Sequence, residues 1–222
     1  MSQDVYQELQ IQLKERLSLA LPGIAAQAHM APPQRFPKNH QQVYKPNANT
    51  RIGCVLILLY PGEDQRVYFP LIVRPEYEGV HSGQVALPGG KKDEEDLDFI
   101  ATALRETSEE IGVEVDRSLV LGRLSQLYIP PSNFIVHPVV AAIPHKPQFI
   151  PSPREVASMI TVDLMSLLGD AKREVKEVQW KGQTVNLPFY NIDGNTVWGA
   201  TAMILGEFIK IIDELQLSPM LD

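Results

Sequence analysis

Three glutamates stand close together near the middle of the chain, at Glu106, Glu109 and Glu110. Their spacing of i, i+3 and i+4 places them on one face of an α-helix, close to one another. Such carboxylates repel one another, and the only base beside them is Arg105. Oxygen-rich sites suit hard divalent cations, Mg²⁺ or Mn²⁺, which bind together with waters and substrate phosphates. The pattern indicates a metal site on a helix, with a solvated acidic face as the alternative.

A glycine pair lies ahead of this helix, in Leu87-Pro88-Gly89-Gly90-Lys91-Lys92. Paired glycines let the backbone adopt positive φ and approach other groups closely. A loop of this kind can bring the far end of the acidic helix against the strand from which the loop emerges. A glycine pair alone is a weak signal, but together with the acidic helix it indicates one site.

The net charge of the chain is concentrated in the same region. The chain has 27 acidic and 20 basic residues, a formal charge of −7, and ten of the acids but three of the bases lie within residues 91–116. The rest of the chain carries 17 of each sign. An acidic balance argues against binding to a nucleic-acid backbone, which needs a basic face. Within the acidic stretch, residues 93–98 are expected to be a solvated loop and helix start.

Strands and two main helices must position these residues. Helices are predicted over 97–111, with Gly112 as the C-terminal stop, and over 199–215. A short apolar run over 84–87 leads into the glycine pair. Strand patterns cover residues 51–60, 67–74, 119–128, 134–143, 156–162, 174–180 and 183–190. This order predicts an α+β fold, in which a mixed β-sheet is flanked by helices as an α/β/α sandwich.

Residues 1–48 are interpreted as an extension ahead of a domain over residues 49–222. Apolar residues between Gln3 and Leu21 predict a loosely amphipathic helix, ended by Pro22-Gly23. Prolines among Gln, Asn and His then indicate an irregular arm. We expect the helix to dock on the domain; a helix that binds a partner is the alternative.

Composition excludes several classes of protein. The 222 residues suffice for one full domain plus extensions. Cys54 is the only cysteine and lies in an apolar run, so we expect a packed thiol and no intramolecular disulfide. No stretch approaches the roughly 18–20 apolar residues of a membrane span, and the first residues show no secretory signal. We therefore expect a cytoplasmic protein without a membrane or nucleic-acid partner.

The segment from Gly90 to Val113 resembles a known family motif. Its residues Gly90…Arg105-Glu106-Thr107-Ser108-Glu109-Glu110-Ile111-Gly112-Val113 are similar to the Nudix box, G-x5-E-x7-R-E-U-x-E-E-x-G-U, where U is aliphatic. The motif differs at two points. Asp96 occupies the first acidic position and is followed by eight residues before Arg105, where the motif has seven, and Thr107 occupies a position that is usually aliphatic. Asp96 is therefore not assigned to the metal. A salt bridge from Asp96 to Arg105, orienting the loop, is expected instead.

A second resemblance lies upstream of the box. Leu71-Ile72-Val73-Arg74 and Gly83-Gln84-Val85-Ala86-Leu87-Pro88-Gly89-Gly90 resemble the additional signature of coenzyme A pyrophosphatases, as does the inserted residue in the box. Pro75, Gly79 and Leu87 stand where that signature has serine, arginine and phenylalanine. The tracts 130–140 and 198–202 are also similar to this branch, so the resemblance covers residues 50–215.

The resemblance implies a Nudix-like fold and metal-dependent hydrolysis of a nucleoside diphosphate linked to another group. Its implied substrate is coenzyme A or an acyl-CoA. Other nucleotides (ADP-ribose, dinucleotides or oxidised nucleotides) and a non-catalytic nucleotide-sensing role are the alternatives. Glu106 and Glu110 are the expected ligands of Mg²⁺ or Mn²⁺, with Glu109 a further ligand or the base that orients water. Arg105 is counted with Glu106 and Glu109 in the catalytic group.

Basic residues around the glycine pair are candidate phosphate contacts, because arginine and lysine give charge-assisted hydrogen bonds to phosphates. These are Arg74, Lys91 and Lys92, with Gly89 and Gly90 expected in the same substrate site. Solvated surface bases are the alternative reading of each cation.

Other side chains leave their roles open. His81 is a weaker candidate for a substrate contact. The aromatic residues Tyr128, Phe134 and Trp198 either stack on adenine or pack in the core. The sequence leaves the oligomeric state open, with a homodimer as one alternative.

Overall fold

Strand β1 (Arg51–Pro61) is the centre of the fold in the computed structural model. The structure describes residues 3–32, 35, 45–76, 78, 82–169, 172–180 and 182–215. Strand β1 is buried on both faces because nearly every residue from Cys54 to Tyr60 is apolar, as is typical of a strand inside a sheet covered on both sides.

Around β1 a mixed sheet forms in the order β3-β2-β1-β7-β5. The pairing of β1 with β7 is parallel, and the other pairings of this sheet are antiparallel. Strand β4 pairs with β1, β6 with β7 and β8 with β2. The bounds are β2 Val67–Val73, β3 Val85–Ala86, β4 Gly89–Lys91, β5 Val120–Arg123, β6 Leu127–Ile129, β7 Phe134–Ala142 and β8 Ser158–Asp163. The expected mixed sheet is confirmed.

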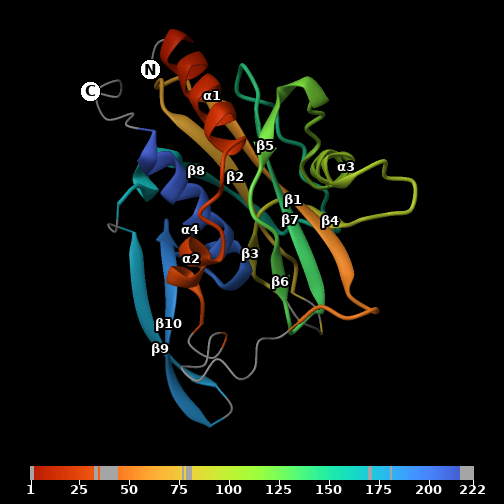
Figure 1. Cartoon of the computed structure of the whole chain (residues 1–222), viewed down its shortest axis with the longest axis vertical. Helices are drawn as coiled ribbons and strands as arrows, with labels where there is room; N and C mark the ends of the chain where they lie inside the picture. The colour runs from red at the N-terminus through yellow and green to blue at the C-terminus, as the bar shows by residue number, and fades with distance from the viewer. Residues whose placement is uncertain are drawn as a thin grey trace.

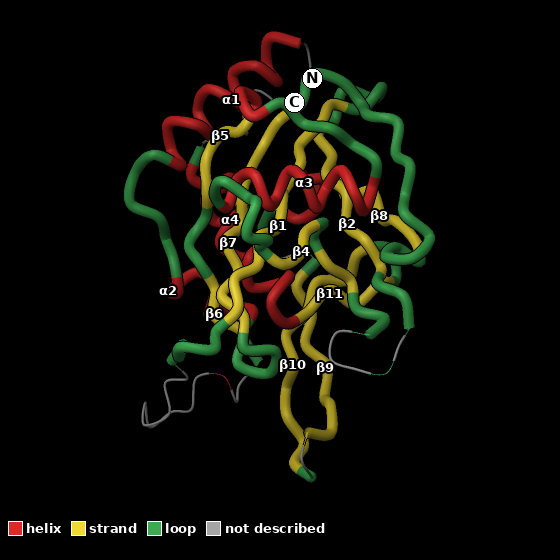
Figure 2. Tube along the Cα trace, turned by 90° about the vertical axis from the view of Figure 1, so that its right-hand side faces the viewer, coloured by secondary structure: helices red, strands yellow, loops and turns green. Residues whose placement is uncertain are grey.

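Helices cover both faces of this sheet. Helix α3 (Phe99–Ile111) lies across one face of the sheet (Figure 2). On this face Leu56 and Leu58 pack with Ala103 and Ile111. Helices α1 (Gln3–Leu17) and α4 (Gly199–Glu214) lie on the other face, with Ile57 in their apolar cluster. The α/β/α sandwich is therefore confirmed (Figure 1). Short helical turns occur at α2 (Ile24–Gln27) and at 28–30, 117–119 and 164–167.

A second sheet projects from the sandwich (Figure 1). It contains β9 (Arg173–Trp180), β10 (Gln183–Ile192) and β11 (Asn195–Trp198), in the order β11-β10-β9. Strand β11 leads directly into α4 and places the start of that helix beside β3, where the hydroxyl of Thr201 donates to the carbonyl of Val85 at 3.1 Å.

Several predicted boundaries are wrong. The first helix ends at Leu17 and not at Leu21. The predicted strand over 119–128 is two strands, β5 and β6, which both pair with β7 and are separated by the non-strand residues 124–126. Helix α3 starts at Phe99 because Asp98 is its N-cap and accepts a hydrogen bond from the backbone N–H of Ala101. Strands β4 and β11 were not predicted, since each is short.

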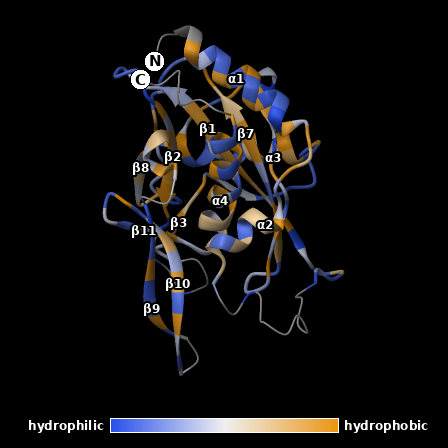
Figure 3. Ribbon diagram, turned by 60° about the vertical axis from the view of Figure 1, so that its left-hand side comes forward, coloured by the Kyte–Doolittle hydropathy of each residue, from blue (hydrophilic) through white to orange (hydrophobic). Residues whose placement is uncertain are grey.

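Helix α1 is docked on the domain. The hydroxyl of Tyr6 donates to the carbonyls of Leu59 and Ile143, each at 3.0 Å, and Leu9 and Leu13 are buried in the cluster shared with α4. The outward side of α1 carries hydrophilic residues, while the central strands are largely hydrophobic (Figure 3). Residues 33–34 and 36–44 of the expected arm lie outside the described residues. Within the part of the chain that the structure describes, no helix is long and apolar enough to cross a bilayer.

Replacing Leu13 by alanine should destabilise the protein by about 2–5 kcal/mol, because the buried side chain leaves a cavity. The matched control is Ile11→Ala on the same helix, where the side chain is 54% exposed and a change within about 0.5 kcal/mol is expected. Urea unfolding measures both. Equal effects of the two substitutions would contradict the docked position of α1.

Candidate active site

Helix α3 carries the three glutamates, and its ends are fixed by local interactions. Asp98 caps its start, and Gly112 ends it in the left-handed conformation at φ 70°. Thr107, which stands where the Nudix box has an aliphatic residue, is fully buried, and its hydroxyl donates to the carbonyl of Ala103 at 2.7 Å. The threonine thus fills a core position with its polar group satisfied, so this departure leaves the helix intact.

The glycine pair forms strand β4, which lies between β1 and α3. Gly90 pairs with Cys54 and Gly89 with Val55. Gly89 has a φ of 146°, and a Cβ there would overlap the carbonyl of Cys54. A Cβ on Gly90 would overlap the carboxylate of Glu106. The two glycines are therefore needed because the backbone touches a strand on one side and a catalytic candidate on the other.

Glu106 and Glu110 converge on this strand. The backbone N–H of Gly89 donates to Glu110 Oε2 at 2.7 Å, and Glu106 lies against Gly90. Burial raises the pKa of Glu110 to about 7, against the opposing effects of the Gly89 N–H and the Arg74 charge. Burial also raises the pKa of Glu106, against the effect of Arg105. Because both carboxylates are partly desolvated and lie against the same strand, a bound cation would stabilise their charged forms.

Glu109 does not join them. Its carboxylate is 53% exposed and faces Arg105, 3.2 Å from Nη1. In the described part of the chain, no group of three or more His, Cys, Asp or Glu side chains is arranged to hold a metal ion. The donor set that does converge, Glu106 and Glu110, fits a hard divalent cation whose remaining positions are filled by water and phosphate oxygens.

Arg105 is the centre of an ion-pair network. It binds Asp96 with two hydrogen bonds of 3.0 Å, lies 3.0 Å from Glu106, and donates to the carbonyl of Lys91. The expected salt bridge between Asp96 and Arg105 is therefore present. This pairing holds the pKa of Asp96 far below its usual range. The contacts of Arg105 within the chain are those of a residue that positions Glu106 and the loop.

The expectation of a solvated loop over residues 93–98 is wrong for Asp96. Its side chain is only 7% exposed, and it accepts from the backbone N–H of Asp93 at 3.0 Å as well as from Arg105. Asp98 is the helix cap and pairs with Arg117, an interaction that lowers its pKa to about 2. Two of the acids in this loop thus organise the approach to α3.

Glu155 is an acidic residue near the site that the sequence did not indicate. It lies in the loop before β8, which is held to the end of α3 by backbone hydrogen bonds from Ile150 to Ile111 and from Ser152 to Glu110. Burial is the main cause of the raised pKa of both Glu106 and Glu110. The negative charge of Glu155 raises both pKa values further, as a smaller contribution. No local motif marks it, because only the tertiary contact between this loop and α3 places it there.

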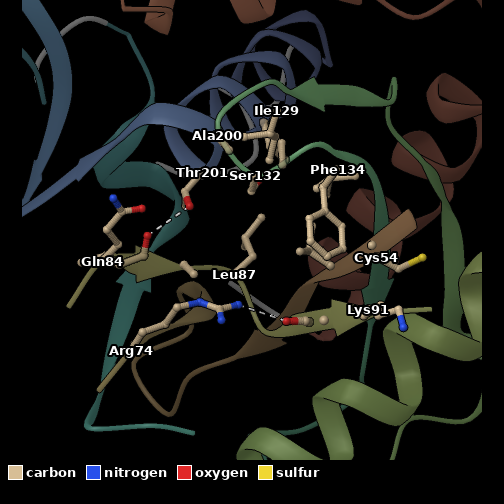
Figure 4. Close-up of a pocket in the computed structure, with 18 of the residues that line it drawn as sticks. Cys54, Arg74, Gln84, Leu87, Lys91, Ile129, Ser132, Phe134, Ala200 and Thr201 are labelled. Carbon is tan, nitrogen blue, oxygen red and sulfur yellow. Dashed lines mark hydrogen bonds between the residues drawn. The ribbon is translucent and has the colours of Figure 1, made fainter. Parts of the chain in front are cut away.

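A cavity of about 340 Å³ adjoins the glycine strand (Figure 4). Its walls come from β1, β3, β4, the β6–β7 loop and the start of α4, and they are mostly apolar. The polar, charged and large apolar side chains of its lining include Arg74, Gln84, Leu87, Lys91, Phe134, Trp198 and Thr201. Glu106 and Glu110 are not part of its lining, but they touch Gly89 and Gly90, which are.

The predicted cations fall into two groups. Arg74 lines the cavity, and its Nη2 donates to the carbonyl of Gly89 at 3.4 Å, while Lys91 lines the cavity near α3 (Figure 4). Lys92 instead donates to the backbone carbonyls of Asp93 and Asp96, so its side chain stabilises the acidic loop. His81 and Gly79 lie outside the described residues.

The remaining candidates divide in the same way. Phe134 and Trp198 line the cavity, whereas Tyr128 is not in its lining and donates its hydroxyl to Asn133 at 3.0 Å. Cys54 is fully buried, and burial raises the pKa of its thiol to about 11. The packed thiol expected from the sequence is confirmed.

The NUDIX domain family model matches residues 50–181, more than half of the chain. The chain belongs to the Nudix family. It is a Nudix hydrolase with pyrophosphohydrolase activity; the family typically uses a divalent metal and binds nucleotide substrates.

Similar proteins agree with the family assignment. An uncharacterized Nudix hydrolase NudL from Photorhabdus laumondii is 36% identical over 130 residues, 59% of this chain and 69% of that protein. Nudix hydrolase 15, mitochondrial, and Nudix hydrolase 22, chloroplastic, both from Arabidopsis thaliana, are 33% and 30% identical over 69% and 86% of this chain. The chain covers only 55% and 61% of those two plant proteins.

A solved structure supports the fold. The crystal structure of a MutT/nudix family protein from Enterococcus faecalis superposes with a TM-score of 0.55, over 85% of this chain and 72% of that one, at 16% identity. At this level of identity the likeness concerns the fold alone.

The raised pKa of Glu110 makes the metal-free protein less stable as the pH rises. The free energy of unfolding should fall between pH 4.5 and about 7, because the folded state disfavours the carboxylate. That pKa difference corresponds to at most about 3 kcal/mol. Glu110→Gln, whose amide oxygen can still accept from Gly89, should therefore gain stability over the native chain at pH 8 but not at pH 4.5. Thermal unfolding in EDTA measures this, and a pH-independent difference would contradict it.

Proposed function

We propose that this Nudix hydrolase cleaves the diphosphate of coenzyme A or an acyl-CoA. The products are 4′-phosphopantetheine, or its acyl form, and adenosine 3′,5′-bisphosphate. The observation that carries the proposal is a mostly apolar cavity that meets the carboxylates at the glycine strand. A substrate with a diphosphate flanked by bulky groups can place the diphosphate at Gly89 and Gly90 and a flanking group in the cavity. The resemblance of residues 71–90 to the coenzyme A signature supports the same substrate.

Glu106 and Glu110 are proposed as the protein ligands of Mg²⁺ or Mn²⁺. When bound, the metal neutralises non-bridging phosphate oxygens and lowers the pKa of the attacking water. The glycine strand supports this role because it keeps both carboxylates within reach of a phosphate without an intervening side chain. Glu109, exposed beside Arg105, is proposed to orient water or to complete the metal site.

The cations of the site have separate roles in this proposal. Arg74 lies between the cavity and Glu110, where its guanidinium can bind a phosphate oxygen next to Gly89. Lys91 offers a second charge at the other end of the glycine strand. Arg105 holds Glu106 and the acidic loop in place, and its part in the catalytic group is that of a positioning residue.

We also propose a cytoplasmic location and a homodimer. The only cysteine, Cys54, is buried, which agrees with a reducing compartment. Strand β9 is the end strand of its sheet among the described residues. Antiparallel pairing of two copies along β9 about a two-fold axis would continue this sheet from one copy into the other.

Incubation of the full chain with Mg²⁺ or Mn²⁺ and a substrate panel tests the proposed function. The panel contains coenzyme A, an acyl-CoA, ADP-ribose, a dinucleotide and an oxidised nucleotide, and mass spectrometry identifies the products. We expect phosphopantetheine, or its acyl form, and no product in EDTA. Turnover of the other nucleotides alone would overturn coenzyme A as the proposed substrate. Nucleotide binding without turnover would overturn the proposed catalysis and favour a nucleotide-sensing role.

Substitution of each carboxylate separates their roles. Glu106→Gln and Glu110→Gln should each lower kcat by orders of magnitude while the fold persists, because each removes a negative metal ligand. Glu155→Gln should raise the metal concentration needed for half-maximal activity by several-fold, since its charge acts on both ligands. Glu114→Gln, an exposed position just beyond α3, is the control. Near-normal turnover of the Glu110 variant would overturn the ligand assignment.

A further inference from the structure

Arg51 lies at the edge of the cavity and is held on an aromatic wall. Its guanidinium carbon lies 4.2 Å from the centroid of the Phe134 ring, and Phe134 lines the cavity. Its Nη2 donates to the carbonyl of Ser132, another lining residue, at 2.8 Å. Arg51 and Phe134 are also register partners in the parallel pairing of β1 with β7. The strand pairing, the stacking and the hydrogen bond fix the orientation of this cation.

No described carboxylate neutralises Arg51. Its contacts are with a ring and a carbonyl oxygen, and no described Asp or Glu lies within 4.0 Å of it. Arg35 is similar: it donates to the carbonyl of Tyr128, next to the lining residue Ile129, and forms no described ion pair. Burial lowers the pKa of Arg35. Two arginines at one edge of the cavity thus have unused capacity to bind an anion.

The distance from Arg51 to the glycine strand separates it from the diphosphate position. Gly53 lies two residues along β1, about 7 Å away, and pairs with Lys91 of β4. A Cβ on Gly53 would lie 3.1 Å from the carbonyl oxygen of Gly90 and 3.2 Å from the Phe134 ring. The ring therefore spans the space between the glycine strand and Arg51. An anion at Arg51 is a different group of the ligand from a diphosphate at Gly89 and Gly90.

We propose that Arg51, stacked on Phe134 and assisted by Arg35, binds a second phosphate of the substrate, a phosphate monoester on the nucleotide sugar. This inference rests on the proposed function and adds the feature by which the site would select its substrate. Guanidinium groups give bidentate, charge-assisted hydrogen bonds to phosphates, and a phosphate monoester carries more charge per group than a diphosphate ester. The aromatic face beside Arg51 provides a surface for the base or sugar of the same nucleotide.

Hydrogen bonds fix the β6–β7 turn beside Arg51, which is the first residue of β1. Asn133, at φ 50°, accepts from the hydroxyls of Thr50 and Tyr128 and donates to the carbonyl of Asn49. The β6–β7 turn is therefore fixed to the residues just before β1. Such preorganisation lowers the cost of ordering the site when an anion binds.

Binding of paired ligands in EDTA tests this subsite without turnover. The first pair is coenzyme A and 3′-dephospho-coenzyme A; the second is ADP-ribose 2′-phosphate and ADP-ribose. Each pair differs only by one phosphate monoester. Titration calorimetry on the full chain should show at least about tenfold tighter binding of the phosphorylated member of one pair, as a charge-assisted contact provides. Arg51→Gln should remove this preference and leave the affinity for the other member within about twofold.

Two further variants control for charge and folding. Arg66→Gln removes an arginine paired with Asp163, outside the cavity lining, and should leave the preference unchanged. Arg51→Lys keeps the charge but loses the planar fork, and should retain part of the preference. If the Gln variant does not fold, a reduced preference in the Lys variant still supports the subsite, and an unchanged preference in that variant overturns it.

The outcomes separate this inference from the proposed function. Absence of a preference in both pairs, or a preference that Arg51→Gln does not change, overturns the subsite even if coenzyme A is hydrolysed. A preference that depends on Arg51 in the ADP-ribose pair, with no hydrolysis of coenzyme A, supports the subsite and overturns the proposed substrate. An equal effect of Arg66→Gln would show a general charge effect and overturn it as well.

Discussion

The hydrogen bond from the backbone N–H of Gly89 to Glu110 is the interaction on which the site depends. It joins the last turn of α3 to the strand that pairs with β1, and so fixes the helix against the sheet. The contact is possible only because neither Gly89 nor Gly90 carries a side chain. It also keeps a carboxylate in a buried position, where burial raises its pKa. Packing and chemistry are therefore set by the same few atoms.

This arrangement explains why the net negative charge of the chain is concentrated in one stretch. Arg105 compensates part of it through Asp96, Glu106 and Glu109, and Asp98 caps the helix. Asp96 and Asp98 are thus part of the scaffold, whereas Asp93, Glu94 and Glu95 are exposed, as the solvated loop expected from the sequence requires. What remains uncompensated is the negative charge at the glycine strand. A buried charge without a partner is costly, so a cation bound at Glu106 and Glu110 would stabilise the protein.

The sequence predicts most of the fold because its signals are local. The apolar run of β1, the apolar positions of α3 at helical spacing and the cap at Gly112 can be read from neighbouring residues. Strand β4 has only three residues and is defined by its contact with β1, so no periodicity marks it. Glu155 reaches the site through the loop that binds the end of α3. Arg51 is distinguished by the ring beside it and by having no carboxylate partner among the described residues. Such features depend on tertiary contacts, which spacing along the chain does not encode.

The site has opposite charges at its two ends, and this restricts what fits. Carboxylates lie at the glycine strand, Arg74 lies beside them, and Arg51 lies beyond the Phe134 ring without a described acidic partner. A ligand with a single phosphate can satisfy one end only. A ligand with a diphosphate and a separate phosphate monoester brings negative charge to both, with a metal ion balancing the first. In the proposed function, the apolar cavity between them would take a base or an acyl group, and so the proposed site would favour large, multiply phosphorylated nucleotides over small ones.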